Sequence, residues 1–194
     1  MSGSLAWRPL RQPALLAWRW RGRLRALRLL VLDVDGVLTD GGLWTTESGE
    51  VIKRFDVRDG LGIRLLQQAG LEVALLSGGK SGATEQRARY LGISQCLTGV
   101  KDKPEAMARL QDTLGVTAAQ TAFVGDDLND LAVRPAVGLL LCPADAVAPL
   151  RQRADAVLAA GGGHGAVRSL AEAILRARDE WRVLSRSGWR DRNG

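Results

Sequence analysis

The sequence of 194 residues is poor in cysteine, histidine and aromatic side chains. Its two cysteines, Cys96 and Cys142, form no CxxC pair, which removes the usual motif of a zinc or dithiol redox site. Both lie in apolar runs, which predicts two buried free thiols and is consistent with a reducing cytoplasm. No window approaches the roughly 20 apolar residues of a membrane span. His164 is the only histidine, and we interpret it as a loop residue rather than a metal ligand or base.

The start of the chain lacks acidic residues, the first of which is Asp33. Seven arginines lie in this stretch and interrupt its apolar runs, which argues against a secretory signal. The rest of the chain is nearly neutral, so the net charge of +6 does not indicate a nucleic-acid-binding domain. We expect residues 1–26 to form a poorly ordered, Arg- and Trp-rich leader, residues 27–181 a domain and residues 182–194 a tail. Contact of the leader with an anionic membrane surface or with nucleic acid is the alternative.

The stretch "ALLSGGKSG" (residues 74–82) contains part of a nucleotide-binding phosphate loop but lacks its first glycine. That motif requires a glycine five positions before Gly79, where this chain has Ala74. We therefore do not expect Lys80 to bind a nucleotide triphosphate.

From residue 27 onward, short apolar runs alternate with helical stretches. Strands are expected at 27–34, 71–77, 93–99, 121–126, 136–142 and 155–159. Helices are expected at 60–69, 82–91, 103–114, 128–133, 146–153 and 166–181. Continuous apolar runs are typical of strands buried on both faces of a parallel sheet. The alternation therefore predicts a doubly wound α/β fold with a mainly parallel sheet. Segment 43–57 breaks the pattern and is predicted to be a projecting β-hairpin with its turn at 47–49.

Polar residues follow several of the predicted strands. Asp33 and Asp35 end the first strand, Ser77 the second, and Asp126 precedes Asp127 at the end of a later one. In an α/β sheet, ligands bind at the carboxyl ends of the strands. Carboxylates combined with a hydroxyl and Lys103 suit a hard cation such as Mg²⁺ together with a phosphate.

Several motifs place these residues in a known family. They are "DVDGVLTDG", "FDVRDGLGIR", "VALLSG", "TGVKDK", "FVGDDLND" and "GGGHGAVR". With them the chain resembles phosphatases of the haloacid dehalogenase superfamily, and more narrowly the 3-deoxy-D-manno-octulosonate 8-phosphate phosphatase family. The resemblance runs from about residue 30 to residue 175.

The resemblance implies a role for each catalytic residue. Asp33 is the expected nucleophile, forming an aspartyl phosphate, and Asp35 the expected general acid and base. Mg²⁺ is the expected cofactor, held by Asp33, the backbone carbonyl of Asp35 and Asp126. Ser77 and Lys103 are expected to bind the phosphoryl oxygens. The expected supporting residues are Asp127, through metal-bound water, and Asp130, which would orient Lys103.

The resemblance also implies a substrate site for a sugar-acid phosphate. The expected contacts are Asp56, Val57, Arg58, Asp59, Gly60, Arg64, Gly78 and Arg87. Gly79 and His164 stand where the family usually has arginine, and Ser169 where it has glutamate. Lys80 is the candidate replacement for the first missing cation. A nonulosonate 9-phosphate is therefore the alternative to octulosonate 8-phosphate as substrate.

No cap domain is expected, because the intervals between Asp35 and Ser77 and between Ser77 and Lys103 are too short. Members of the family instead form tetramers in which a neighbour covers each site, and hairpin 43–57 suits that use. We expect a cytoplasmic homotetramer with a small-molecule substrate and no nucleic-acid partner. A non-catalytic oligomerisation domain of the same fold is the competing interpretation.

Overall fold

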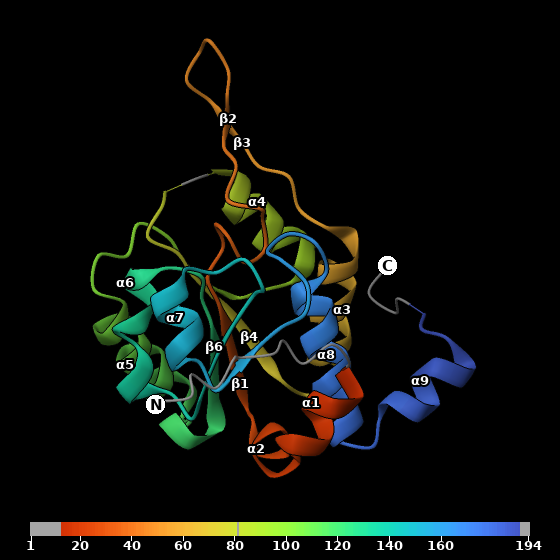
Figure 1. The fold of residues 1–194 in the computed structure, drawn as a ribbon. Helices are drawn as coiled ribbons and strands as arrows, with labels where there is room; N and C mark the ends of the chain where they lie inside the picture. Colours follow the sequence, from red (N-terminus) through yellow and green to blue (C-terminus); the bar gives the residue numbers. More distant parts are fainter. Residues whose placement is uncertain (1–12, 81, 191–194) are drawn as a thin grey trace, which may run out of the picture.

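The computed structural model describes residues 13–80 and 82–190. Within them, a parallel six-stranded sheet has the order β5-β4-β1-β6-β7-β8 (Figure 1). Its strands are β1 (Leu29–Leu32), β4 (Glu72–Leu76), β5 (Gln95–Leu97), β6 (Thr121–Val124), β7 (Leu139–Cys142) and β8 (Ala156–Val157). The central strand β1 has uninterrupted apolar sequence because both of its faces are buried. The predicted α/β fold with its parallel sheet is confirmed.

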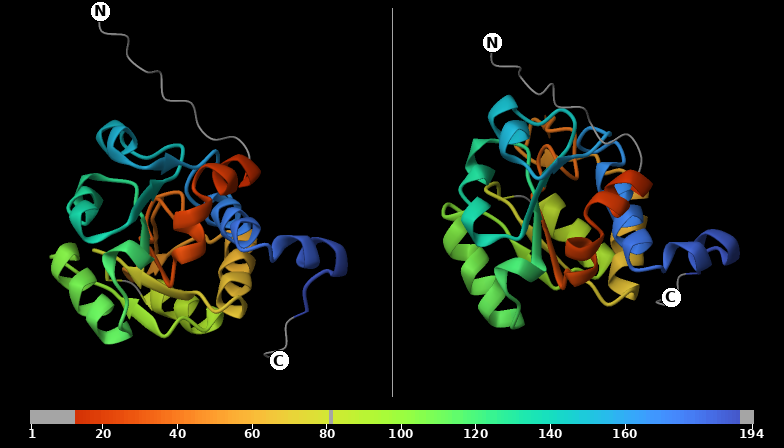
Figure 2. Two further views of the ribbon diagram at one scale, coloured as in Figure 1. Left: turned by 90° about the horizontal axis from the view of Figure 1, so that it is seen from below. Right: turned by 60° about the horizontal axis from the view of Figure 1, so that its bottom comes forward.

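Helices cover the sheet on both faces (Figure 2). Leu30 and Leu32 of β1 pack on one face, and Leu29 and Val31 on the other, as strand geometry requires. The first face is covered by α1 (Pro13–Arg19), α2 (Arg21–Ala26), α3 (Val57–Gln68), α4 (Gly82–Leu91) and α8 (Ala166–Ala177). The second is covered by α5 (Lys103–Leu114), α6 (Leu128–Leu131) and α7 (Ala148–Arg153), with a short 3₁₀ turn at Arg134–Ala136. A further 3₁₀ turn, Ala118–Gln120, precedes β6.

The leader differs from the expectation. Residues 13–26 form α1 and α2, whose Leu16 and Leu24 are buried in the same core cluster as the apolar side of α8. Arg21 and Arg25 both form ion pairs with Asp179, which offsets part of the leader's charge. The predicted poorly ordered leader is therefore wrong for residues 13–26, and residues 1–12 lie outside the described residues. Among the described residues, no helix has the length and apolar character needed to cross a membrane.

The C-terminal end also differs from the prediction. Helix α8 stops at Ala177 rather than at residue 181, and Asp179 turns the chain with a φ of 67°. A separate helix, α9 (Trp181–Ser187), follows and packs Trp181 and Leu184 against the core. The first part of the predicted tail is thus attached to the domain, and residues 191–194 lie outside the described residues.

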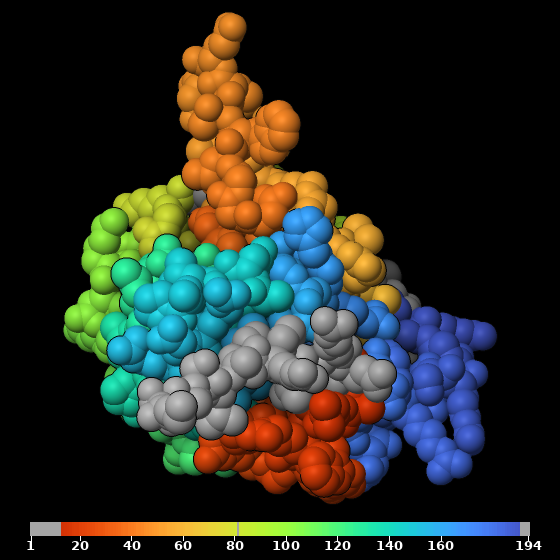
Figure 3. Space-filling view, in the orientation of Figure 1, coloured from red at the N-terminus to blue at the C-terminus, as the bar shows by residue number. Residues whose placement is uncertain are grey.

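The predicted hairpin is present and stands away from the domain (Figures 1 and 3). It consists of β2 (Trp44–Thr45) and β3 (Val51–Ile52), and Gly49 supplies a φ of +84° at the turn. Leu43, Trp44 and Ile52 are 59%, 72% and 54% exposed. Between β1 and β4 the chain holds this hairpin and α3, and between β4 and α5 it holds α4 and β5. The described residues therefore contain no cap domain.

Candidate active site

The predicted catalytic residues lie at one edge of the sheet because its strands are parallel. Asp33 directly follows β1, Ser77 directly follows β4, and Asp126 comes two residues after β6. The backbone N–H of Asp33 donates to the Val124 carbonyl at 2.9 Å, which extends the β1–β6 pairing into the site.

Carboxylates converge at this edge. Asp33, Asp126 and Asp130 each place one oxygen within 4.8 Å of the others. The close approach depends on Gly36, whose φ of +82° suits glycine. A Cβ at position 36 would lie 2.0 Å from Oδ2 of Asp126, so any side chain there would displace that carboxylate.

The carboxylate of Asp130 already has hydrogen-bond partners within the protein. Lys103 Nζ lies 2.5 Å from Oδ1 of Asp130, and Oδ2 accepts the backbone N–H groups of Asp126 and Asp127 at 2.8 and 3.3 Å. Lys103 also contacts Asp33 Oδ1 at 3.2 Å. Asp130 thus orients Lys103 and the loop, which leaves Asp33 and Asp126 as the carboxylates best placed for a cation.

The electrostatics of the cluster agree with a cation site. Burial and then the charge of Asp130 raise the pKa of Asp33 to about 6. Burial and then the charge of Asp33 raise the pKa of Asp126 to about 7. Burial lowers the pKa of Lys103, but Asp33 and Asp130 together outweigh it and the net shift is upward. A divalent cation would relieve the repulsion that remains between Asp33 and Asp126, and their oxygens are the donors that Mg²⁺ prefers. The residues present therefore fit a magnesium ion.

Asp127 and Ser77 occupy the rest of the edge. Asp127 is exposed and caps α6, where its Oδ1 accepts the N–H of Leu128 at 2.6 Å. Ser77 is 1% exposed, and its hydroxyl accepts the N–H of Gly79 at 3.3 Å. The backbone of Ser77 bonds to Leu97 and Val100, which fixes the position of the hydroxyl.

Asp35 has a partner that the sequence did not indicate. Lys53, directly after β3, lies with its Nζ 2.7 Å from Oδ1 and 2.8 Å from Oδ2 of Asp35. The Lys53 ammonium also donates to Thr84 Oγ1 of α4 at 3.3 Å. No residue spacing could have predicted this contact, because it depends on where the base of the hairpin meets the edge of the sheet.

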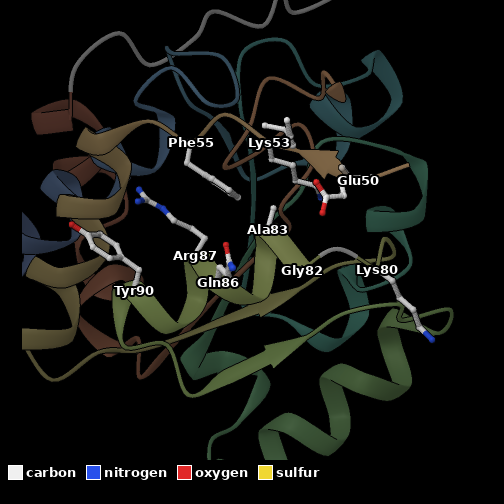
Figure 4. Close-up of a pocket in the computed structure, with 11 residues that line it drawn as sticks. Glu50, Lys53, Phe55, Lys80, Gly82, Ala83, Gln86, Arg87 and Tyr90 are labelled. Carbon is white, nitrogen blue, oxygen red and sulfur yellow. The ribbon is translucent and has the colours of Figure 1, made fainter. Parts of the chain in front are cut away.

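A cavity of about 760 Å³ lies beside Lys53, between the hairpin and α4 (Figure 4). Its lining includes Glu50, Lys53, Phe55, Lys80, Arg87 and Tyr90. Arg87 stacks on Phe55 at 5.3 Å and donates to the Asp56 carbonyl at 3.1 Å. The ammonium of Lys80 points away from the other labelled side chains in Figure 4, and its stem packs against Gly99.

Of the predicted substrate residues, Arg87 lines this cavity. Gly60 leaves room for the Arg87 side chain, because a Cβ at position 60 would lie 2.5 Å from the Arg87 guanidinium. Arg64 lies outside the cavity lining and stacks on Tyr90 at 4.9 Å. Gly78 packs near the Val100 carbonyl.

The remaining predicted substrate contacts lie at the start of α3. Asp56 caps the helix and pairs with Arg58, whose side chain is 63% exposed, while Val57 is 79% exposed. Asp59 is 1% exposed and accepts the N–H groups of Gly165 and Arg168. Its carboxylate therefore joins α3 to the start of α8.

The three departures from the family pattern have different surroundings. A Cβ at Gly79 would lie 3.3 Å from Oδ2 of Asp35, so a side chain there would project over that carboxylate. His164 lies in the loop before α8, with Nδ1 2.6 Å from the Gly162 carbonyl and Nε2 3.3 Å from Arg54. Ser169 lies within α8.

The fold and the strand-end cluster of carboxylates and lysine are those of a haloacid dehalogenase-like hydrolase. The family model of these hydrolases matches residues 50–138. A 3-deoxy-D-manno-octulosonate 8-phosphate phosphatase of Haemophilus influenzae is 43% identical over 162 residues, covering 84% of this chain and 90% of that protein. The chain belongs to the 3-deoxy-D-manno-octulosonate 8-phosphate phosphatase family.

Solved structures agree with this assignment. The enzyme of the same name from Yersinia pestis has a TM-score of 0.82 and 41% identity, covering 84% of this chain and 88% of that chain. The Moraxella catarrhalis enzyme, in complex with a magnesium ion, a phosphate ion and a KDO molecule, has a TM-score of 0.85 and 32% identity. That match covers 88% of this chain and 98% of the other.

Proposed function

We propose that this protein hydrolyses 3-deoxy-D-manno-octulosonate 8-phosphate, with Mg²⁺ as its cofactor. The observation that carries the proposal is the convergence of Asp33, Asp126 and Lys103, with Lys103 Nζ 3.2 Å from Asp33 Oδ1. The family relatives support the substrate, and the Moraxella complex supports the cofactor. Asp33 and Asp126, with the backbone carbonyl of Asp35, would hold the ion, which supplies charge neutralisation between a carboxylate nucleophile and a dianionic phosphate.

The first step is phosphoryl transfer to the protein. A carboxylate oxygen of Asp33 attacks phosphorus while the bond from phosphorus to the sugar oxygen breaks. Asp35 gives its proton to the departing sugar oxygen. Ser77 and Lys103 stabilise the negative charge on the phosphoryl oxygens as it develops.

The second step releases phosphate. Asp35, now a carboxylate, takes a proton from water as that water attacks phosphorus, and the bond to Asp33 breaks. Inorganic phosphate leaves, and both aspartates return to their initial protonation states. Asp130 keeps Lys103 in place during both steps.

Substrate selection belongs to the cavity beside Asp35. Arg87 lines it and is the cation best placed for a sugar carboxylate, since arginine binds carboxylates in a bidentate manner. Arg64 has a supporting place through its stacking on Tyr90. The relatives favour octulosonate 8-phosphate over the nonulosonate 9-phosphates, although Gly79 and His164 replace family arginines.

The test compares sugar phosphates in the presence of Mg²⁺, including octulosonate 8-phosphate and nonulosonate 9-phosphates, for the wild type and Asp33→Asn. We expect the highest kcat/KM for octulosonate 8-phosphate, and complete loss of turnover in the variant. Turnover that persists in Asp33→Asn would exclude the mechanism. A wild type without activity on any phosphate would favour the non-catalytic oligomerisation domain, which the intact catalytic set argues against.

We also propose that the protein works as a cytoplasmic homotetramer in which hairpins pack together and a neighbour covers each site. The support is the exposed apolar surface of Leu43, Trp44 and Ile52, which water disfavours. The two free cysteines suit a reducing compartment. Sedimentation of Trp44→Ser is the test of assembly: we expect dissociation, and an unchanged sedimentation coefficient would contradict hairpin-mediated assembly.

A further inference from the structure

The ammonium group of Lys53 connects the hairpin to the general acid of the proposed mechanism. Its Nζ lies 2.7 and 2.8 Å from the two oxygens of Asp35, and 3.3 Å from the hydroxyl of Thr84. The Lys53 side chain is 2% exposed, and Thr84 is 1% exposed. A lysine so deeply buried must gain from its partners, because lysines are rarely buried unless paired.

We propose that Lys53 is a positioning residue for Asp35, an inference that rests on the proposed phosphatase function. The terminal torsion of an aspartate is broad and does not fix the direction of its oxygens. The Asp35 side chain is also 34% exposed, so packing alone holds it weakly. An ammonium near both oxygens fixes the plane of the carboxyl group and aims one oxygen at the leaving group.

Lys53 also acts between the two proton transfers. When the phosphorus–oxygen bond of the substrate breaks, the proton of Asp35 goes to the departing oxygen and Asp35 becomes anionic. The ion pair with Lys53 and its hydrogen bond to Oδ2 then stabilise this anion until it takes a proton from the attacking water. The Lys53 ammonium keeps its own proton throughout, so no further acid or base is needed.

The location of Lys53 makes the hairpin part of the catalytic apparatus. Lys53 comes directly after β3, and its second partner, Thr84, lies on α4. The contact therefore joins three segments: the hairpin, α4 and the loop after β1. It also forms part of the wall of the cavity, next to Ala83 and Phe55 in Figure 4.

The test exploits the different need of two esters for a general acid. Octulosonate 8-phosphate releases an alkoxide, which must be protonated, whereas p-nitrophenyl phosphate releases a stable phenolate. For Lys53→Met we expect kcat on the sugar ester to fall about 100-fold, the effect of a misplaced catalytic group. The burst rate with p-nitrophenyl phosphate reports formation of the aspartyl phosphate without a general acid. That rate and the concentration of Mg²⁺ at half-saturation should change far less, whereas hydrolysis of the intermediate should slow for both esters.

Three further variants complete the experiment. Lys101→Met, an exposed lysine outside the site, should match the wild type on both esters. Thr84→Val removes the second partner of Lys53. We expect a smaller loss of activity than for Lys53→Met, and this loss should again be larger on the sugar ester. Lys53→Arg should recover part of the lost activity. If Lys53→Met does not fold, Thr84→Val and Lys53→Arg still test the inference.

Equal losses in the burst rates with the two esters would show a general structural role and overturn the inference, as would an unchanged kcat on the sugar ester. These outcomes leave the proposed function intact, because that depends on Asp33→Asn abolishing turnover of both esters. If the wild type hydrolyses neither ester, the proposed function itself is wrong.

Discussion

The floor of the site and its rim are built in different ways. The floor consists of four residues, each within two positions of the end of a strand or helix: Asp33, Asp126, Asp130 and Lys103. The rim consists of the β2–β3 hairpin and α4, which enclose a cavity and expose apolar side chains to solvent. The floor is thus assembled within one chain, whereas the rim exposes the apolar side chains on which the proposed tetramer depends. The proposed function assigns phosphoryl transfer to the first region and substrate choice to the second.

The largest expected effect comes from removing the ammonium group of Lys103 from the floor. Lys103→Met leaves Asp33 and Asp130 without their shared partner. It also removes the positive charge that would stabilise the oxygens of the transferred phosphoryl group. We expect kcat to fall about 1,000-fold, the upper range for loss of one such electrostatic contact. We also expect a lower melting temperature, because breaking a buried ion pair costs about 3–5 kcal/mol.

Lys101→Met is the matched control, since this lysine is exposed and lies two residues earlier in the chain. Steady-state kinetics with p-nitrophenyl phosphate and thermal unfolding measure the two effects. A kcat of Lys103→Met within tenfold of the wild type would show that the floor does not need this charge.

The next prediction compares one glycine beside the floor, Gly36, with one in the rim, Gly49. Gly36 and Gly49 have almost equal φ angles of +82° and +84°, so alanine at either position has a similar backbone cost. At Gly36 the new Cβ would also lie 2.0 Å from Asp126 Oδ2, whereas at Gly49 nothing lies within 4 Å. We expect Gly36→Ala to weaken Mg²⁺ binding at least tenfold, as seen by calorimetric titration.

Gly49→Ala should bind Mg²⁺ as the wild type does. Equal affinities for the two variants would mean that Asp126 is free to move away from residue 36 without loss of the ion.

The difference between floor and rim also explains what the sequence could predict. Helix α5 was predicted with both ends correct, because Asp102 caps its start and Gly115 ends it with a φ of +60°. Such signals are local, and so are the strand-end aspartates. Lys53 was missed because its partner Asp35 is selected by the fold of the hairpin. The burial of Leu16 was missed for a similar reason, because α1 and α2 pack against α8, which lies far along the chain.

The last expected effect is a pH dependence of the floor. Burial and neighbouring carboxylates raise the pKa of Asp33 to about 6 and of Asp126 to about 7. In the unfolded chain such groups titrate near pH ~4, so the folded, metal-free protein binds more protons between these values. Its stability must therefore fall as pH rises from about 4 to about 7, by at most about 1.4 kcal/mol per pH unit for each carboxyl.

Mg²⁺ reverses the sign of this dependence because it binds the deprotonated carboxylates. Thermal unfolding at pH 6 and pH 8 should show a larger stabilisation by Mg²⁺ at the higher pH. Asp126→Asn should lose most of that difference, whereas Lys53→Met should keep it, because Lys53 contacts Asp35 and not the carboxylate pair. A stabilisation by Mg²⁺ that is equal at both pH values would mean that these carboxyl groups are already ionised in the metal-free protein. If Lys53→Met instead lost the response, the floor and the rim would be coupled through more than the orientation of Asp35.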